Sequence, residues 1–255
     1  MFLLYLAQSK ACGYRPTQGV HLYSDKQLIE IQARVLFTHD ANGRIVAINE
    51  PDGEAAPRFF LGRTTTGNLC RFRHDVPDDI VAELTTLFNR EPIPQDLRKP
   101  PLYLEAYQQI LAAHAPTRVA EHGPAYYFPE VITPPAGIAT TRMTHANTDV
   151  LQSHFGWMIP VLHLMPPVYA VVQDGSAVAV CFSSRIPSVA DEAGVNTAEA
   201  YRGRGYAAAV VVSWANAIRG LRRTPLYSTR WDNLASQAVA RKLGLVMYGD
   251  DLSLT

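Results

Sequence analysis

The sequence predicts an α+β protein with a smaller amino-terminal α+β unit and a larger carboxy-terminal unit of alternating strands and helices. Runs of β-branched and aromatic residues flank Asn-Gly and Asp-Gly pairs in both halves, which predicts antiparallel hairpins. Residues 207–218 carry apolar side chains at helical spacing. The most proline-dense stretch, residues 91–101, disfavours a continuous helix and predicts a linker. We therefore expect two domains, residues 1–98 and 99–255.

Composition limits the classes of partner. The 255 residues hold 23 Lys and Arg against 23 Asp and Glu, so no net field attracts nucleic acid or an anionic membrane, and we expect neither partner. The apolar residues 2–7 are far shorter than the roughly 18 residues of a membrane span and predict a strand or buried segment. Three scattered cysteines and eight scattered histidines match no disulfide or zinc pattern. We expect a cytoplasmic protein without a metal.

The amino-terminal unit is expected to be a small sheet with one helix. Residues 33–38 and 44–48 predict a hairpin around Asn42-Gly43, and residues 59–62 and 68–73 predict two further strands. After Pro77, apolar residues from Ile80 to Phe88 fall on one helical face. The role of this unit is left open between a substrate-facing surface and a small-ligand module.

The carboxy-terminal unit has a regular order of elements. A helix is expected at residues 102–111, then strands at 168–172 and 177–182 around Asp174-Gly175, and a third strand at 192–197. The helix from residue 207 ends at Gly220, and a strand follows at residues 226–229. Asp232 or Asn233 is expected to cap the next helix, and two short strands, 245–248 and 252–254, close the chain.

The stretch Arg202-Gly203-Arg204-Gly205 lies where a long helix begins, and it predicts an anion site. The first N–H groups of a helix have no intrahelical acceptor, and the helix dipole adds positive potential there. Glycines let an oxygen-rich ligand approach the main chain, and arginines add charge-assisted hydrogen bonds. A tight turn with solvated arginines is an equal alternative. A dinucleotide-binding loop is disfavoured because its third glycine and later acidic residue are missing.

Residues 197–207 resemble the acyl-coenzyme A signature of GNAT-type N-acetyltransferases, which is Arg or Gln, two residues, Gly, one residue, then Gly or Ala. Arg202, Gly205 and Ala207 fit this pattern in register. Residues 192–197 look like the family's fourth strand, and residues 231–236 with 242–244 look like the exit of its fifth strand and the next helix. The resemblance covers about the last 90 residues. The start of the family core, between residues 100 and 152, matches poorly.

The resemblance implies a GNAT-like mixed central sheet flanked by helices, with acetyl-coenzyme A (acetyl-CoA) as cosubstrate between the fourth and fifth strands. Arg202 takes the family's Arg/Gln position, whereas Arg204 faces either a phosphate or solvent. Asn233 and Ser236 match positions near the pantetheine arm and the phosphates, although helix capping explains them equally well. The residues implied in coenzyme binding are Val195, Asn196, Thr197, Arg202, Gly203, Arg204, Gly205, Tyr206, Ala207, Asn233 and Ser236.

The implied reaction moves an acetyl group from acetyl-CoA to a primary amine by direct attack in a ternary complex. A main-chain N–H near Val195 or Asn196 would polarise the thioester carbonyl. Glu192 is the first candidate for the catalytic proton acceptor and Asp191 the second, although a structural glutamate at a strand end explains Glu192 as well. Many family members carry a tyrosine as general acid seven positions after the asparagine, where this chain has Ala240.

Two alternatives follow from that departure. Tyr206 or Tyr227 is a replacement proton donor, or the chain is a noncatalytic acyl-CoA-binding sensor. The acceptor is expected to be a small-molecule or peptide amine, which the sequence does not identify. A homodimer is compatible with exposed strands.

Overall fold

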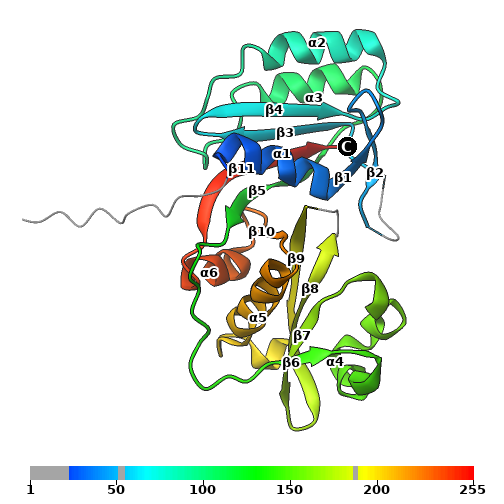
Figure 1. Ribbon diagram of the computed structural model, residues 1–255. Coiled ribbons are helices and arrows are strands. Elements are labelled where there is room, and N and C mark those ends of the chain that lie inside the picture. Colours follow the sequence, from blue (N-terminus) through cyan, green and yellow to red (C-terminus); the bar gives the residue numbers. More distant parts are fainter. Residues whose placement is uncertain (1–22, 51–54, 186–188) are drawn as a thin grey trace, which may run out of the picture.

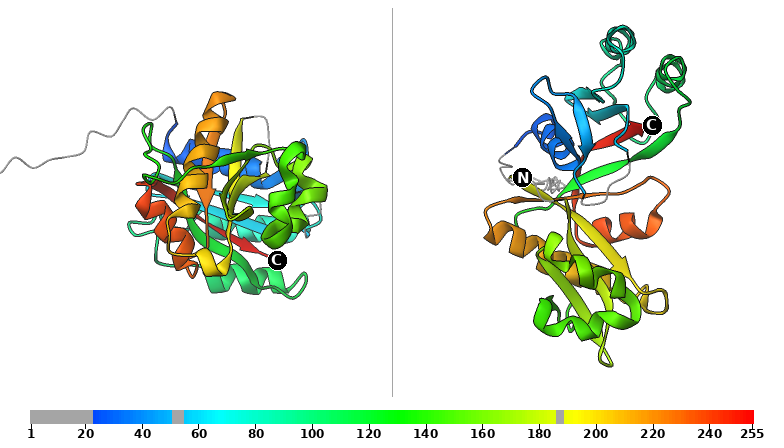
Figure 2. Two further views of the ribbon diagram at one scale, coloured as in Figure 1. Left: turned by 90° about the horizontal axis from the view of Figure 1, so that it is seen from below. Right: turned by 90° about the vertical axis from the view of Figure 1, so that its right-hand side faces the viewer.

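A computed structural model describes residues 23–50, 55–185 and 189–255, so the apolar stretch at residues 2–7 lies outside it. Its centre is a sheet with strand order β4-β3-β11-β5-β10-β9-β8-β7-β6 (Figure 1). Among the described residues, every strand pairing in this sheet is antiparallel except that of β9 with β10. The sheet is therefore mixed, as the resemblance implies, and helices flank it on both faces (Figure 2).

The elements follow one another in two groups. The first comprises α1 (Asp25–Leu36), β1 (Phe37–His39), β2 (Ile45–Ile48), β3 (Phe59–Thr64), β4 (Gly67–Phe72), α2 (Asp78–Phe88), α3 (Leu104–Ala112) and β5 (Val119–Tyr127). The second comprises β6 (Thr141–Met143), η1 (His145–Leu151), α4 (Gln152–Phe155), η2 (Gly156–Leu164), β7 (Val168–Gln173), β8 (Ser176–Arg185), β9 (Ala190–Thr197), η3 (Glu199–Tyr201), α5 (Tyr206–Gly220), β10 (Thr224–Ser228), α6 (Leu234–Lys242) and β11 (Val246–Leu254).

The strand expected at residues 33–38 is wrong for most of its length, because α1 runs through Leu36. Ser24 and Gln27 form a capping box that starts this helix, and its apolar residues then fall on one buried face. Only the hairpin turn is as expected: Gly43 has φ +75°, and Phe37 pairs with Ile48. An apolar run of six residues fits a strand and a buried helical turn equally well, and here the cap upstream decides the outcome.

The last strand joins the two halves of the molecule. The two short strands expected at 245–248 and 252–254 form one strand, β11, whose register shifts near Gly249. β11 pairs with β5 on one side and with β3 on the other. The carboxy-terminal strand is thus inserted into the amino-terminal half of the sheet. The division at residues 98 and 99 stays a prediction, with α2 and α3 on either side of the proline-rich segment.

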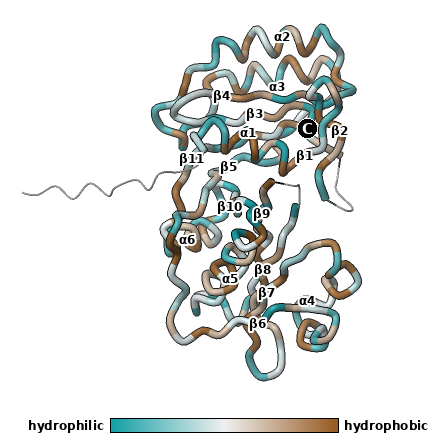
Figure 3. The backbone as a smooth tube through the Cα atoms, in the orientation of Figure 1, coloured by the Kyte–Doolittle hydropathy of each residue, from teal (hydrophilic) through white to brown (hydrophobic). Residues whose placement is uncertain are grey.

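Two faces of the sheet carry separate cores. On one face, α5 buries Trp214 and its neighbours against β8, β9 and β10, together with Ala240 of α6. On the other face, α1 packs Leu28 and Ile29 near Leu226, and the segment η1–α4–η2 covers β7 and β8. Hydrophobic and hydrophilic residues alternate along α2 and α3 at the far end of the sheet (Figure 3). The strands between α1 and α5 are therefore covered on both sides.

A buried ion pair fastens β3 to β11. The guanidinium of Arg63 donates to both carboxylate oxygens of Asp250 at 3.0 and 2.7 Å, and it also donates to the carbonyl oxygens of Leu97 and Lys99. His122 of β5 lies 3.0 Å from the same carboxylate. Arg63 is 3% exposed and Asp250 is fully buried. One residue pair thus joins the two halves of the sheet and the proline-rich segment.

We expect Asp250→Asn to lower the free energy of unfolding by about 3 kcal/mol, because it leaves a buried guanidinium without its charged partner. Urea unfolding followed by circular dichroism measures this change. Glu30→Gln is the control: Glu30 pairs with Arg34 at the surface of α1, and such pairs contribute at most about 0.5 kcal/mol. Equal effects of the two changes would contradict a central role for the Arg63–Asp250 pair.

Candidate active site between β9 and β10

The site forms where two parallel strands diverge. β9 and β10 are in register only from Ala190–Thr224 to Glu192–Leu226. Beyond Glu192, β9 stays with β8 as far as Thr197, whereas the chain after β10 follows β5. The edge of β9 from Ala193 to Thr197 that faces β10 therefore has no strand partner there. An opening with free main-chain groups results, and an extended ligand can pair with them.

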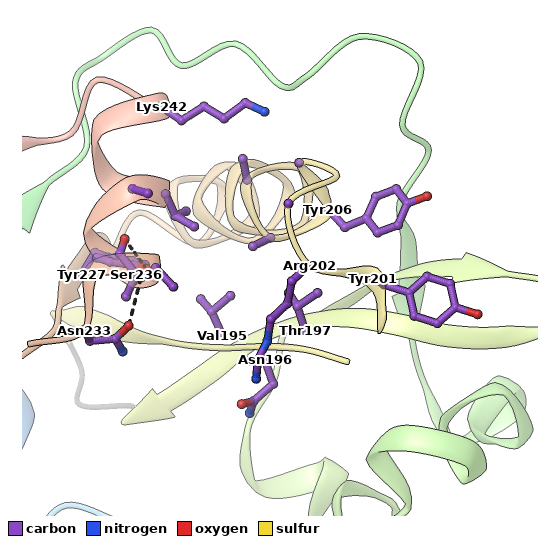
Figure 4. Close-up of a pocket in the computed structure, with 17 residues that line it drawn as sticks. Val195, Asn196, Thr197, Tyr201, Arg202, Tyr206, Tyr227, Asn233, Ser236 and Lys242 are labelled. Carbon is purple, nitrogen blue, oxygen red and sulfur yellow. Dashed lines mark hydrogen bonds between the residues drawn. The ribbon is translucent and has the colours of Figure 1, made fainter. Parts of the chain in front are cut away.

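A cavity of about 610 Å³ lies on the α5 side of this opening (Figure 4). It brings together every residue implied in coenzyme binding except Arg204. Its lining comprises Val195, Asn196, Thr197, Tyr201, Arg202, Gly203, Gly205, Tyr206, Ala207, Ala208, Tyr227, Asn233, Ala235, Ser236, Ala238, Val239 and Lys242. We call it the first cavity.

The start of α5 faces the first cavity with its backbone donors free of side-chain caps. Gly203 and Gly205 have φ values of +77° and +85°, which side chains other than glycine rarely adopt. Gly205 is the N-cap residue, and no side chain accepts a hydrogen bond from this helix end. The first N–H groups of α5 therefore remain available for an anion.

The two arginines of the turn have different surroundings. Arg202 lines the first cavity together with Asn196 and Thr197 (Figure 4). Arg204 instead donates to the carbonyl oxygen of Ala200 at 3.1 Å, and its guanidinium lies 5.1 Å from the centre of the Tyr201 ring. Arg204 thus braces the turn rather than facing the cavity.

Asn233, Ser236 and Tyr227 form one connected group at the other end of the first cavity. The Asn233 side chain accepts from the Ser236 N–H at 3.0 Å, which caps α6, so a capping role and a place in the cavity coexist. The Tyr227 hydroxyl lies 2.5 Å from the Ser236 hydroxyl (Figure 4). Burial raises the pKa of Tyr227 to about 12. Its phenol therefore keeps its proton throughout the neutral range.

Sequence reasoning missed Lys242 as a cavity residue. A Cβ built on Gly205 would lie 2.9 Å from the Lys242 ammonium nitrogen, so this cation stands beside the glycine turn. Its position in the last turn of α6 suggested only a favourable charge at a helix end. Ala240, by contrast, is fully buried under α5, and a tyrosine does not fit in that packed space.

The two acidic candidates face opposite sides of β9, and neither lines the first cavity. Asp191 accepts from Ser183 at 2.7 Å and from Arg223 at 2.8 Å, and Ser183 in turn accepts from Trp214. It is therefore engaged in the packing beneath α5. Glu192 is 2% exposed and accepts from the Ser228 hydroxyl at 2.6 Å. Burial raises its pKa, and its Oε2 atom has no hydrogen-bond partner among the described residues.

A second cavity, of about 500 Å³, is lined by strands of the sheet and by the amino-terminal elements α1, β1 and β2. Its lining comprises Leu36, Phe37, Ile48, Glu50, Ala55, Pro57, Ala120, Glu121, His122, Gly123, Arg185, Ser228, Thr229, Arg230, Asn233, Asp251, Ser253 and Thr255. Asn233 lines both cavities. The two cavities therefore meet at the start of α6.

Asp251 is the buried acid of the second cavity. Its Oδ2 atom accepts from the Gln32 amide at 2.6 Å, and the Gln32 carbonyl accepts from the Tyr248 hydroxyl at 2.8 Å. Burial, followed by the nearby charges of Asp250 and Glu192, raises the pKa of Asp251 from 3.8 to about 8. This carboxyl therefore keeps its proton at neutral pH.

The described ranges hold neither a cluster of metal-ligating side chains nor a helix that could span a membrane. Across residues 23–50, 55–185 and 189–255, no group of three or more His, Cys, Asp or Glu side chains is placed to hold a metal ion. None of the helices in these ranges has the length and apolar character of a membrane span.

Residues 169–249 match the family model described as GNAT acetyltransferase. This segment runs from β7 to β11 and contains the diverging strands, the glycine turn and α6. The segment is therefore similar to the GNAT acetyltransferase family. No curated protein matches the sequence significantly.

Solved structures are similar to the chain at low identity. A GCN5-related N-acetyltransferase-like protein from Streptococcus suis is 14% identical with TM-score 0.48, covering 91% of this chain and 100% of that one. A GNAT-family acetyltransferase from Colwellia psychrerythraea is 14% identical with TM-score 0.46, and the match covers 73% of this chain and 75% of that one. A putative GNAT acetyltransferase from Novosphingobium aromaticivorans is 18% identical with TM-score 0.40. The match covers 54% of this chain and 66% of that one, so this chain spans just under two thirds of that protein. The similarity to the family is carried by residues 169–249.

We expect Asp251→Asn to remove a pH-dependent loss of stability. Because the pKa of Asp251 is raised from 3.8 to about 8 in the folded chain, the native protein loses stability as pH rises through this interval. Asparagine resembles the protonated acid and cannot ionise. The variant should therefore match the parent near pH 4 and exceed it by pH 8 in urea unfolding at each pH. A constant difference between the two proteins across this range would contradict the raised pKa.

Proposed function

We propose that the chain is an N-acyltransferase that transfers an acetyl group from acetyl-CoA to a primary amine by direct attack in a ternary complex. The observation that supports this most is the first cavity. There a free strand edge, a glycine turn and an uncapped helix start converge, within a segment similar to the GNAT acetyltransferase family. Each of these features binds a different part of an acyl-coenzyme A molecule.

Main-chain groups carry most of the proposed coenzyme binding. Val195 and Thr197 offer N–H and C=O groups on the free edge of β9, which suit the amide groups of a pantetheine arm. The helix start from Gly203 to Ala207 offers N–H donors to the pyrophosphate, with Tyr206 in its first turn. Lys242 adds positive charge beside the glycine turn, and Arg202 adds a second cation to the cavity lining. This arrangement explains why small residues are needed at the turn.

Two groups are proposed to act on the thioester. An N–H near Val195 or Asn196 polarises the carbonyl as negative charge develops on its oxygen. Tyr227 takes the place of the acid missing at Ala240, because its phenol lines the cavity, keeps its proton and is oriented by Ser236. Tyr206 and Tyr201 lie at the opposite end of the cavity in Figure 4, far from this group.

Glu192 is proposed to receive a proton through the hydroxyl of Ser228. Its carboxylate is buried and lines neither cavity, so it does not meet an amine directly. Ser228 lines the second cavity and donates to Glu192. Over the reaction the ammonium ion loses two protons as the C–N bond forms and the C–S bond breaks. One of these protons is taken up by the buried Glu192 carboxylate and passes to solvent. The other is matched by the proton that the departing thiolate gains when it becomes the thiol of coenzyme A.

The remaining expectations are proposals of the same kind. The acceptor is a small-molecule or peptide amine, and neither nucleic acid nor a membrane is a partner. We propose that the protein acts in the cytoplasm without a metal and that it can form a homodimer. The charge balance of the sequence supports the absence of a polyanionic partner.

Release of free thiol from acetyl-CoA across a panel of primary amines tests the function. We expect amine-dependent release that falls in Glu192→Gln, because glutamine cannot accept the proton. Tight binding of acetyl-CoA without thiol release for any amine would contradict the enzyme and support the noncatalytic sensor.

We expect Gly205→Glu to abolish coenzyme binding. The new side chain would meet the Lys242 ammonium, strain a backbone with φ +85° and place a negative charge where the pyrophosphate is proposed to bind. Isothermal titration with coenzyme A measures the loss. Gly175→Glu is the matched control, since Gly175 has φ +76° in the β7–β8 turn and a Cβ there meets nothing within 4 Å. Unchanged binding in Gly205→Glu would overturn the assignment of the glycine turn.

We expect Tyr227→Phe to lower kcat about 10-fold or more while KM for acetyl-CoA changes little, because the proton for the departing thiolate is lost. Steady-state kinetics of thiol release measures both constants. Tyr126→Phe is the control, as its ring packs 6.3 Å from that of Tyr227 without lining the cavity. A kcat equal to that of the parent would remove Tyr227 from the mechanism.

A further inference from the structure

We infer that the second cavity is the acceptor site, and that Asp251 binds and deprotonates the ammonium group of a small primary amine with an apolar body. This inference rests on the proposed acyl transfer. It also assigns a role to the amino-terminal unit, which forms one wall of that cavity.

The position of the second cavity suits an acceptor. Gln32 of α1 holds Asp251, and Ala190 and Leu226 pack with α1, so this cavity and Glu192 belong to the α1 face of the sheet. The first cavity lies on the α5 face. Ser228 at the end of β10 and Asn233 at the start of α6 line the second cavity, and both stand where β9 and β10 separate. An amine on the α1 face therefore approaches the opening from the side opposite the proposed coenzyme.

Two buried carboxyl groups at this point form no ion pair, although the charge of Arg185 lowers the pKa of Glu192 against the larger effect of burial. Asp251 is 8% exposed and accepts a hydrogen bond from the neutral amide of Gln32. The charges of Asp250 and Glu192 disfavour its ionised form. Glu192 has one oxygen on Ser228 and the other without a partner among the described residues. Neither acid takes part in an ion pair within the described ranges. A bound ammonium ion supplies the charge and the donors that both acids lack.

The other charges of the cavity are already paired. Glu50 forms an ion pair with Arg185, and Arg230 pairs with Asp232 at 3.1 Å and approaches Glu121 at 4.0 Å. Arg63 forms an ion pair with Asp250, and the His122 ring lies 3.0 Å from the same carboxylate. One cationic group is therefore enough to complete the site. A polycation would leave further charges without partners.

The wall contributed by the amino-terminal unit is apolar. Leu36 ends α1, Phe37 begins β1 and Ile48 ends β2, and all three line the cavity with Pro57. Contact with these side chains favours a hydrocarbon or aromatic body. Gln32 of the same helix fixes the Asp251 carboxyl, with its own carbonyl held by Tyr248. The unit thus shapes the cavity and orients its acid.

The proposed proton step is balanced. The free carboxyl is protonated at neutral pH, so binding of R–NH₃⁺ first releases the Asp251 proton to solvent. The bound ammonium then gives one proton to the carboxylate, which yields R–NH₂ and a neutral carboxylic acid. The nitrogen lone pair is then free to attack the thioester carbonyl. Burial favours this neutral pair over the ion pair, because charges are poorly solvated there. The carboxyl group ends the step protonated, as it began, and the net result is one proton released to solvent.

Calorimetry with 2-phenylethylamine and the full chain, in the presence of coenzyme A, tests the assignment. We expect the amine to bind and 2-phenylethanol, which lacks the charge, to bind at least about 10-fold more weakly. Asp251→Asn should remove most of this difference and lower kcat for 2-phenylethylamine about 100-fold. Glu91→Gln is the matched control, because Glu91 is a buried carboxylate outside both cavities whose partners are Leu102, Tyr103 and Tyr107. Thermal unfolding confirms that each variant is folded.

The outcomes separate the two proposals. If the parent protein does not bind coenzyme A, the proposed function fails. If coenzyme A binds and Asp251→Asn binds and acetylates 2-phenylethylamine as the parent does, the acceptor site is wrong while the function stands. Tighter binding of spermidine or of a peptide amino terminus than of 2-phenylethylamine would overturn the substrate class. Loss of amine binding with coenzyme binding intact supports the inference.

Discussion

The separation of β9 from β10 after Glu192 is the constraint on which the site depends. β9 keeps its pairing with β8, and the chain after β10 follows β5, where Thr229 and Trp231 donate to the carbonyl oxygens of Pro124 and His122. Gly123 permits this path, since a Cβ there would lie 1.8 Å from the carbonyl oxygen of Thr229. Each diverging strand is thus held on its outer side. An opening with unpaired main-chain groups results.

The glycine turn uses this opening from one side. Residues Glu199 to Gly205 reverse the chain so that α5 begins beside the free edge of β9. Arg204 holds the turn through Ala200 and Tyr201, which leaves Arg202 to face the cavity. Arg204 therefore has a structural role in the turn, whereas Arg202 is directed at a ligand. Their chemistry is the same, and only the direction of each side chain separates the tasks.

The sequence predicted the parts of the site that are close together along the chain. Residues 195–207 and 233–236 carry their information locally, because a strand edge, a positive-φ turn and a helix cap each depend on a few neighbouring residues. Lys242 and Asp251 could not be assigned in this way. Lys242 reaches Gly205 only through the packing of α6 beside α5, and Asp251 meets Gln32, 219 positions away, only because β11 inserts between β3 and β5. The helical state of residues 33–36 was missed for a related reason, since its signal lies in the cap at Ser24.

The insertion of β11 explains why the amino-terminal unit and the carboxy-terminal site act together. A strand that pairs with β3 and β5 places Asp250 and Asp251 on opposite faces of the same sheet. Asp250 forms an ion pair with Arg63, lies 3.0 Å from His122 and stabilises the sheet, whereas Asp251 has no ion pair among the described residues and keeps a raised pKa. A buried acid without a partner costs stability unless a ligand completes it. The adjacent acids therefore have opposite effects, one joining the halves of the fold and the other leaving the second cavity ready for a cation.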